Sequence, residues 1–302
     1  MAKLYFAKMN VNNKIYEVYA NKNLLPRLQE NIFLGISSKE QIYDNKGGRY
    51  KFFDLDKPND TSLTITGNLG YIKAGVHSSY DSNSDDAIDI TDKNKLEYIT
   101  FYFDVQHEIL AYMTLPVLSR KKVLSVFSEL ILKGTEKYEK DGIDVEFMPE
   151  SNLNDLEKEL QKFQHLSKVE VKLVPPNGDK EDFKALSSID VTELQDANAT
   201  EINQTFGNRS KKGLNKKSTL IKKIKKSIGL GFAKAHFFGK NSNNEKVDIN
   251  TAENSPFTKN VSPDSTKRQS IIRQKGEAGI EQILRNNAEI RLEKSDVDDQ
   301  QK

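Results

Sequence analysis

The sequence predicts an α+β protein in which helices pack on a mixed β-sheet. Segments of alternating polar and apolar residues, which are typical of strands, recur from residue 3 to residue 250. Between residues 97 and 175 they alternate with stretches of helical spacing, in the order ββαβαβ. The 302 residues are enough for one large domain or for two sub-domains with a hydrophobic core.

Residues 1–77 are expected to form a β-rich N-terminal sub-domain. The expected elements are a strand at 3–9, a helix at 23–34, a strand at 49–56 and two strands within 62–76 that separate near Gly67 and Asn68. Pro26 falls in the first turn of the expected helix, where a missing N–H group is tolerated.

Residues 78–96 are expected to be an acidic, polar loop or linker, because serine, asparagine and aspartate dominate them. The aspartates are Asp81, Asp85, Asp86, Asp89 and Asp92. The segment lacks the glycine and the terminal glutamate of a calcium-binding loop, so we expect a solvated loop. Such a loop could also mimic phosphate and cover a basic surface of the chain when no ligand is bound.

Residues 97–254 are expected to form a central α+β domain. Its expected elements are strands at 97–105 and 108–115, a helix capped by Ser119, a strand at 143–149, a helix at 152–163 and a strand at 168–175. Short connections of this kind favour right-handed crossovers. After a turn at 175–179, a helical stretch leads into a basic segment, and residues 231–239 and 245–250 predict a closing hairpin.

Residues 255–302 are expected to be a polar tail that is partly helical or disordered. Seven isoleucines and leucines between residues 271 and 292 could line one side of a surface helix. The last eight residues, SDVDDQQK, are polar, and we expect them to be disordered.

The composition argues against the common classes of enzyme and against bound cofactors. The chain has no cysteine and four histidines, none of them at a metal-ligand spacing from another, so neither a thiolate nor a metal site is expected. Glycine-rich nucleotide motifs, serine-hydrolase elbows and zinc-protease signatures are also missing. Without a long apolar run, a secretory leader or disulfides, we expect a non-enzymatic, cytoplasmic protein.

The most informative feature is a basic segment from Arg209 to Lys226, in which nine of eighteen residues are cationic and none is acidic, in a chain of net charge +2. If residues 216–228 are helical, their apolar side chains form one stripe and the lysines project from the other side. Lysine is suited to contact phosphates rather than to read base edges. The candidate phosphate ligands are Arg209, Lys211, Lys212, Lys216, Lys217, Lys222, Lys223, Lys225 and Lys226. The alternative is a solvated helix face, and attachment to a membrane surface is less favoured because the apolar stripe has no Trp or Phe.

Four further cations are candidates for the same interface. Arg120, Lys121 and Lys122 fall in the first turn of a helix, where positive charge opposes the helix dipole, so they either hold phosphate or face solvent. Lys234 follows the basic segment on a strand. It shares a face with Phe232 and Phe238, which could stack on bases but are more often core residues.

The order of elements resembles that of a known group of proteins, the RexA-like phage-exclusion proteins of bacteria and prophages. The similar segments are FYFDVQHEILAYMT, GIDVEFMPES, KVEVKLVPPNGD and GFAKAHFFGKNSNNEKVDINTAENSP. The resemblance covers residues 97–260 and rests on layout rather than on a catalytic motif. It implies a two-domain cytoplasmic protein that binds DNA without strong sequence preference, in some cases together with a membrane partner.

These observations favour a sequence-nonspecific nucleic-acid-binding protein, with DNA preferred over RNA, that acts as a sensor or DNA coat in anti-phage defence or prophage exclusion. The alternative is a protein-interaction module that regulates a membrane or nuclease effector encoded nearby, in which the basic helix meets an acidic partner. A metal-independent ribonuclease is a third, weaker hypothesis. A homodimer is expected, since a second copy multiplies the phosphate contacts.

Overall fold

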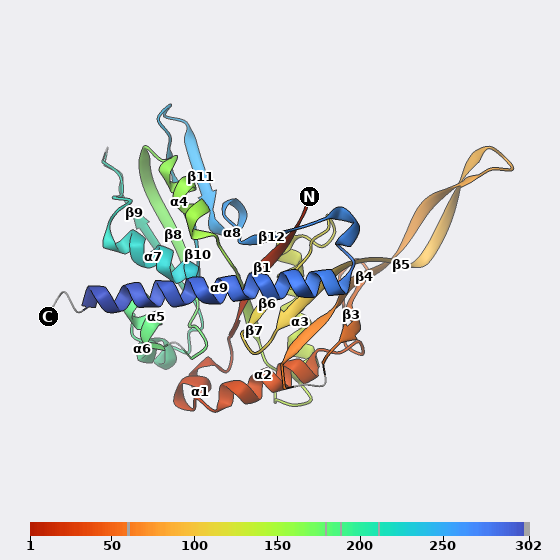
Figure 1. Cartoon of the computed structure of the whole chain (residues 1–302), viewed down its shortest axis with the longest axis horizontal. Coiled ribbons are helices and arrows are strands. Elements are labelled where there is room, and N and C mark those ends of the chain that lie inside the picture. Colours follow the sequence, from red (N-terminus) through yellow and green to blue (C-terminus); the bar gives the residue numbers. More distant parts are fainter. Residues whose placement is uncertain (59–60, 179, 188, 211, 299–302) are drawn as a thin grey trace.

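The computed structural model describes residues 1–58, 61–178, 180–187, 189–210 and 212–298, and it contains two antiparallel sheets joined by one long helix (Figure 1). The first sheet has the order β12-β1-β6-β5-β4-β3-β2, and β7 also pairs with β1. Its strands are β1 (Ala2–Val11), β2 (Gln41–Tyr43), β3 (Arg49–Asp56), β4 (Thr64–Asp81), β5 (Asp86–Asp104), β6 (Ile109–Tyr112), β7 (Val145–Pro149) and β12 (Thr258–Val261). The predicted α+β class is confirmed.

The second sheet and the helices complete the fold. The second sheet has the order β11-β10-β8-β9. Its strands are β8 (His165–Leu173), β9 (Ile202–Gly207), β10 (Ala233–Lys240) and β11 (Lys246–Asn250). The α-helices are α1 (Ile15–Ala20), α2 (Leu24–Gly35), α3 (Arg120–Thr135), α4 (Leu153–Gln161), α5 (Lys180–Ser187), α6 (Val191–Asp196), α7 (Thr219–Gly229), α8 (Thr251–Asn254) and α9 (Gln269–Asp298), and a 3-10 turn covers Pro263–Ser265. None of these described helices combines the length and the apolar character needed to cross a membrane.

Strand β1 holds the first sheet together because it pairs with three other strands. Residues 2–5 pair with β12, residues 5–8 with β6 and residues 7–11 with β7. Leu4, Phe6 and Met9 of this strand are fully buried. Strands from the beginning, the middle and the end of the sequence therefore share one sheet and one hydrophobic core.

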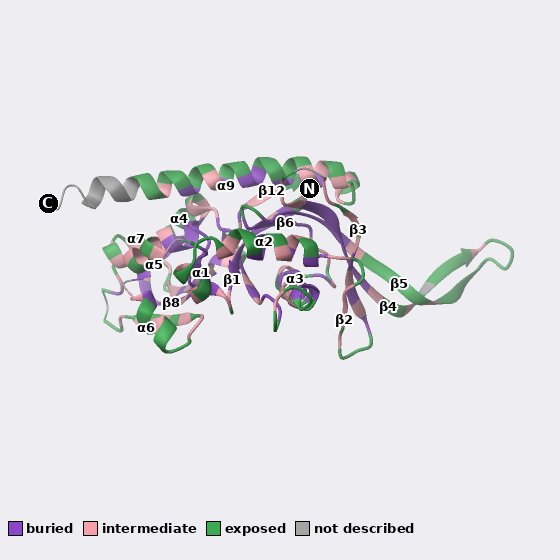
Figure 2. Cartoon of the chain, turned by 90° about the horizontal axis from the view of Figure 1, so that it is seen from below, coloured by how far each residue is buried: buried purple, intermediate pink, exposed green. Residues whose placement is uncertain are grey.

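Different helices cover the two faces of the first sheet (Figure 2). On one face, the ring of Phe127 from α3 lies 4.8 Å from those of Phe52 and Phe101. On the other face, α9 crosses the strands, and a Cβ atom on its Gly279 would lie only 2.2 Å from the ring of Phe6. The glycine thus lets α9 lie directly on the sheet, at the expense of helix propensity.

The second sheet has its own core, which α4, α5 and α7 help to form. Alternate residues of β8 and β10, such as Val169, Val171 and Phe237, are buried. Phe183 of α5 packs against Phe232, with ring centroids 5.9 Å apart. Because α9 continues from the first sheet past α7, it bridges the two halves of the molecule (Figure 1).

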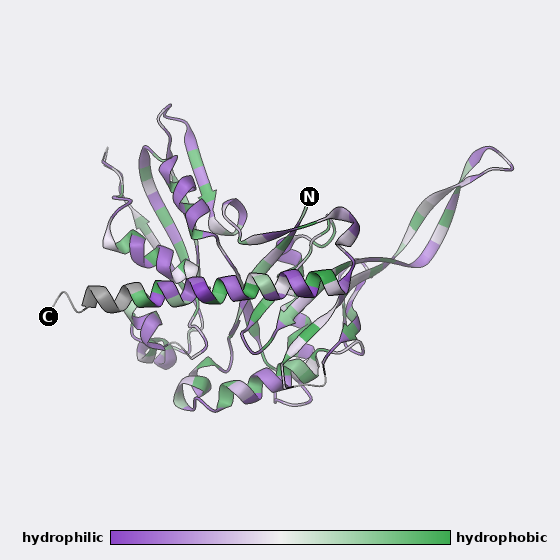
Figure 3. Ribbon diagram, viewed as in Figure 1, coloured by the Kyte–Doolittle hydropathy of each residue, from purple (hydrophilic) through white to green (hydrophobic). Residues whose placement is uncertain are grey.

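The β4–β5 hairpin leaves the first sheet as a two-stranded arm (Figures 1 and 2). The strands stay paired from Thr64 and Asp104 to Asp81 and Asp86, with an irregularity between Lys73 and Gly75. We define the arm as residues 75–92. Nearly every described side chain in it is exposed, and it carries hydrophobic as well as hydrophilic residues (Figure 3).

Two predictions for this region are wrong. Residues 78–81 and 86–96 are strands rather than a loop, because they extend the ladder of the first sheet, and residues 82–85 form the turn between them. Strand β4 also continues through Gly67 and Asn68 without a break. A Cβ atom on Gly67 would lie 2.5 Å from the side chain of Leu55, so this glycine allows close packing rather than a turn.

The ββαβαβ order is confirmed, but its strands do not form one sheet with parallel crossovers. Strand β7 pairs antiparallel with β1, whereas β8 pairs antiparallel with β10 and β9 in the second sheet. The helical stretch expected after residue 179 contains α5 and α6 but also β9. The tail is partly helical, as predicted, because α9 covers Gln269–Asp298. Residues 295–298 belong to this helix, so the expectation that they are disordered is wrong. The last four residues of that expected disordered end lie outside the described part of the chain.

Candidate nucleic-acid interface

Helix α7 separates its apolar residues from its lysines, as the sequence predicts. Ser218 caps the N-terminus by accepting a hydrogen bond from the N–H group of Ile221. Ile221, Ile224 and Ile228 are buried in the core of the second sheet. The basic side of α7 is thereby held at the surface by packing on the other side of the same helix.

The contacts of Lys216 and Lys225 within the chain show how their charges are used. Lys216 Nζ donates hydrogen bonds to the carbonyl oxygens of Phe163, at 2.5 Å, and Leu160, at 3.4 Å, where α4 ends. Lys225 forms an ion pair with Glu157 of α4. Lys216 therefore caps a helix C-terminus, and the charge of Lys225 is partly offset.

The remaining described cations of the segment lie at the surface of the half of the molecule that contains the second sheet. Arg209, Lys212, Lys217 and Lys222 are exposed, and we call these four residues the basic end. Lys223 and Lys226 are half-buried. Lys211, also a predicted phosphate ligand, lies outside the described residues.

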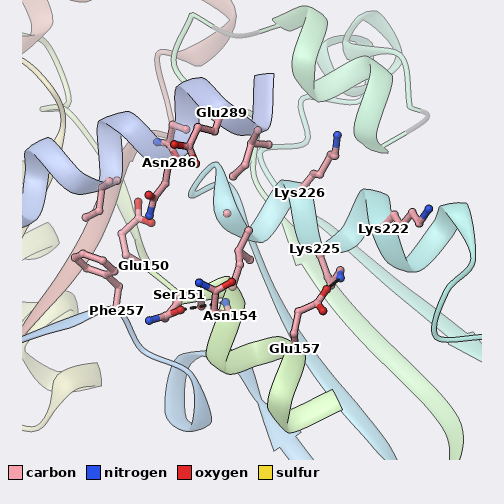
Figure 4. A pocket seen from close by; sticks show the side chains of 16 residues that line it. Glu150, Ser151, Asn154, Glu157, Lys222, Lys225, Lys226, Phe257, Asn286 and Glu289 are labelled. Atoms are coloured by element: carbon pink, nitrogen blue, oxygen red, sulfur yellow. Dashed lines mark hydrogen bonds and ion pairs between the residues drawn. The ribbon is translucent and has the colours of Figure 1, made fainter. Parts of the chain in front are cut away.

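A pocket of about 730 Å³ opens beside these lysines, where α4, α7 and α9 meet. Figure 4 shows the lysines of α7 on one side and Glu150, Asn286 and Glu289 on the opposite side. The apolar walls come from Leu153, Phe257, Ile283 and Ile290. Gly229 allows the three helices to approach, because a Cβ atom on it would lie within 2.8 Å of Leu153 and 2.7 Å of Ile290.

Three buried polar side chains in this pocket have atoms without a hydrogen-bond partner. These atoms are Glu150 Oε1, Ser151 Oγ and Asn287 Oδ1, and the described residues contain one other such atom, Asn10 Oδ1. An unpaired buried polar group costs about 1–3 kcal/mol. Such groups are normally completed by water or by a ligand, so the pocket that they line is a candidate binding site.

Glu150 is held at the end of β7 by backbone hydrogen bonds. Its N–H group donates to the carbonyl of Phe6, at 2.9 Å, and its carbonyl accepts from the N–H group of Phe257, at 2.8 Å. Burial raises the pKa of the side-chain carboxyl to about 8, against a smaller lowering by the charge of Lys8. At neutral pH the group is mostly protonated, so it can donate as well as accept a hydrogen bond.

Three of the other four predicted cations, Arg120, Lys121 and Lys234, line a second pocket of about 570 Å³ between α3 and β10. Arg120 donates to the carbonyl of Ala252, at 2.6 Å, and pairs with Glu253. Lys234 lies 3.9 Å from Glu146, and burial lowers its pKa. Lys121 lines the pocket as well.

Acidic groups outnumber the cations of this second pocket. Four carboxylates line it beside Arg120, Lys121 and Lys234, namely Glu129, Asp144, Glu146 and Glu253, together with the mostly protonated Glu150. Lys122 instead lies with its Nζ atom 4.7 Å from the ring centre of Tyr50. The structure therefore does not join these cations to the basic end, and their surroundings suit a phosphate less well.

The sequence indicates the lysines but not the pocket behind them. Glu150, Ser151 and Asn287 are not candidates from sequence, because nothing in their local pattern shows that they are buried. The one signal is that Glu150 and Ser151 directly follow an apolar strand, where polar side chains often line sites. No group of three or more His, Asp or Glu residues is arranged to hold a metal ion in the described part of the chain.

The aromatic residues near Lys234 divide between core and surface. Phe232 is fully buried, as expected of a core residue. Phe238 is half-buried and packs against His236 with tilted rings, whose centroids are 4.0 Å apart. The Nζ atom of Lys168 lies 4.2 Å from the same ring centre. Phe238 is thus part of a local surface cluster on the second sheet rather than of the pocket.

Comparison with known proteins places the chain in a family without giving it an activity. No curated protein matches the sequence. A family model matches residues 27–277, which include most of both sheets, α7 and the beginning of α9. The chain belongs to the family described as a domain of unknown function, DUF4747.

Proposed function

We propose that this protein binds nucleic acid without sequence preference, and that it prefers an unpaired strand, with DNA as the expected polymer. The observation that carries the proposal is the convergence of Glu150, Ser151 and Asn287, each with an unpartnered buried atom, in a pocket lined by lysines of α7. One part of the site is suited to phosphate and the other to a polar, planar group with hydrogen-bond donors.

The phosphate part consists of point charges on a fixed helix. Lys222 is exposed at the mouth of the pocket, and Lys212 and Lys217 precede it on the basic end. The N-terminus of α4, capped by Asn152, also lines the pocket and adds the positive end of a helix dipole. These groups favour a polyanion of any sequence, and binding through them weakens with salt.

The deeper part of the pocket is suited to a base. The unpartnered atoms of Glu150 and Asn287 are oxygens, which accept hydrogen bonds from amino and imino groups. Phe257 and Ile290 provide apolar walls beside them. A base can reach such a pocket only when it is unstacked, so the geometry favours a single strand over a duplex.

A salt titration tests the phosphate contacts. Fluorescence anisotropy with a labelled single-stranded DNA, between about 50 and 200 mM salt, should give an affinity that falls steeply with salt. Lys217→Ala and Lys222→Ala should each reduce the slope by about one. Lys46→Ala, an exposed lysine in the turn between β2 and β3, is the matched control and should leave the slope unchanged. Absence of binding at the lowest salt would refute the proposal.

The pocket contribution is measured separately. Ser151→Ala and Asn287→Ala should weaken binding of the single strand by about tenfold, the equivalent of a lost hydrogen bond of about 1.4 kcal/mol, with no change in salt slope. Neither should affect the weaker binding of a blunt duplex of the same sequence. Equal losses for strand and duplex would show that the variants act through folding, and thermal melts provide the control for that.

The wider role follows the sequence resemblance alone. We propose that binding serves anti-phage defence or prophage exclusion, which the resemblance to RexA-like proteins implies. The alternative, a protein-interaction module that regulates a neighbouring effector, predicts no affinity for DNA or RNA at low salt. The titration above, repeated with an RNA strand, separates these possibilities.

A further inference from the structure

The arm exposes large apolar side chains, which is unfavourable for a hairpin surrounded by water. Val76, Tyr80, Ile88 and Ile90 are large apolar residues with 44–70% of their surface exposed. A two-stranded ribbon without a third strand or a covering helix is marginally stable at best. Apolar side chains exposed in this way indicate that another surface covers the arm.

Both faces of the arm are available for contact. Tyr80 lies opposite Ala87, and Val76 lies on the same face four pairs along the ladder. Ile88 and Ile90 alternate with them and lie on the opposite face. An occupant could therefore contact either side of the ribbon, or the arm could insert between two surfaces.

The charge of the arm indicates which kind of surface that is. The arm contains five aspartates and neither lysine nor arginine. Asp81 and Asp86 are directly opposed at the end of the ladder, a pairing of like charges that destabilises a hairpin by itself. A cationic partner would relieve this repulsion, so we expect the covering surface to be basic.

The chain has a basic surface of its own, but at the opposite end of the molecule. The arm extends from the far side of the first sheet, whereas α7 and the basic end belong to the second sheet (Figure 1). The arm therefore cannot cover this surface within one copy, in contrast to the expectation that an acidic loop covers a basic surface of its own chain. Phe206, Leu214 and Leu220 are half-buried close to the basic cations, so the surface also has apolar area to offer.

We propose that the arm of one copy docks on the basic end of a second copy of this chain. Two copies that lie antiparallel bring each arm to the other's basic end, which closes a two-fold dimer with two equivalent contacts. Aspartates of the arm meet Lys217 and Lys222, and Ile88 and Ile90, which share one face of the arm, meet the apolar residues between the cations. The inference does not depend on nucleic-acid binding, since it needs only the charges and exposed areas of the two surfaces.

Charge exchange tests the contact directly, in the full chain and without nucleic acid. Size-exclusion chromatography with light scattering should show a dimer at moderate salt. Asp86→Lys with Asp89→Lys should weaken the dimer at least about tenfold, as should Lys217→Glu with Lys222→Glu. Combining the four substitutions restores opposite charges across the contact, so dimerisation should return.

The matched control reverses two exposed lysines elsewhere, Lys39→Glu with Lys46→Glu, and should leave the dimer intact. Replacing residues 76–91 by an Asn-Gly turn should give a folded monomer, with its melting temperature showing that the body is intact. A monomeric unmodified chain would overturn the proposal. So would a combined variant that stays as weak as either pair alone, since the arm would then meet a different surface.

Discussion

Glu150→Gln offers a direct test of the environment inside the candidate pocket. The substitution keeps the shape of the side chain but removes its ability to ionise. Glu150 is 2% exposed, and burial raises the pKa of its carboxyl from an ordinary 4.5 to about 8. The stability of the unmodified protein should then depend on pH in a way that the variant does not share.

The sign and size follow from proton linkage. In the unfolded chain the carboxyl loses its proton near pH 4.5, whereas in the folded protein it keeps the proton until about pH 8. Unfolding between these limits releases a proton, so the free energy of unfolding falls as pH rises and is highest below pH 4.5. At about 1.4 kcal/mol for each pH unit, the loss is on the order of 5 kcal/mol.

Chemical denaturation at a series of pH values from about 5 to 8 measures the effect. The quantity of interest is the difference in unfolding free energy between the unmodified protein and Glu150→Gln, because other titrating groups cancel in it. This difference should shift in favour of the variant with rising pH. Glu289→Gln, on the exposed side of the same pocket, is the control and should show no such trend. A constant difference for Glu150→Gln would mean that the carboxyl is ionised in the fold, and the account of the pocket floor would be wrong.

Three further predictions concern contacts outside the pocket. Lys216→Met should lower the free energy of unfolding by about 2 kcal/mol, because the charged hydrogen bond to Phe163 is lost, while the salt slope of DNA binding is unchanged. Gly279→Ala should destabilise the fold by about 1–3 kcal/mol through its clash with Phe6, although alanine favours a helix. The control, Ala278→Gly on the exposed side of α9, should destabilise it by about 1 kcal/mol through helix propensity alone. Urea unfolding of the two variants measures both effects. Shortening the arm should raise the apparent affinity for single-stranded DNA at concentrations that support the dimer, since arm and strand use the same cations; anisotropy measures this, and an unchanged affinity would contradict a shared surface.

Local patterns predicted much of the secondary structure because those elements are determined by neighbouring residues. The apolar stripe of α7 and the capping serine Ser119 depend on spacings of three or four residues. The hairpin of β10 and β11 depends on alternation around a polar turn. Features of this kind can be read without knowledge of the rest of the chain.

The errors concern features that depend on distant residues. Residues 87–91 alternate in polarity, as a strand does, but the surrounding serines and aspartates favour a loop, and only the long ladder with β4 makes the segment a strand. Likewise, β1 supplies the partner of β7, so β7 and β8 fall in different sheets. The pocket is another case, since Glu150 and Asn287 are brought together by the docking of α9. No periodic pattern in the sequence indicates that two residues so far apart in the chain line one pocket.

The internal contacts of the basic segment limit the number of its cations that are available to contact phosphates. Among the described residues of the segment, the four cations of the basic end are exposed, whereas Lys216 caps α4 and Lys225 pairs with Glu157. A site with about four phosphate contacts has the weak, salt-sensitive affinity of non-specific binding, roughly 10⁻⁴ to 10⁻⁶ M. Stronger binding must come from the pocket, through a captured base, because a second copy docked through its arm covers the basic end instead of adding phosphate contacts. The same basic end is also the proposed docking site of the arm, so DNA that gains affinity from the pocket should displace the arm and separate the two copies.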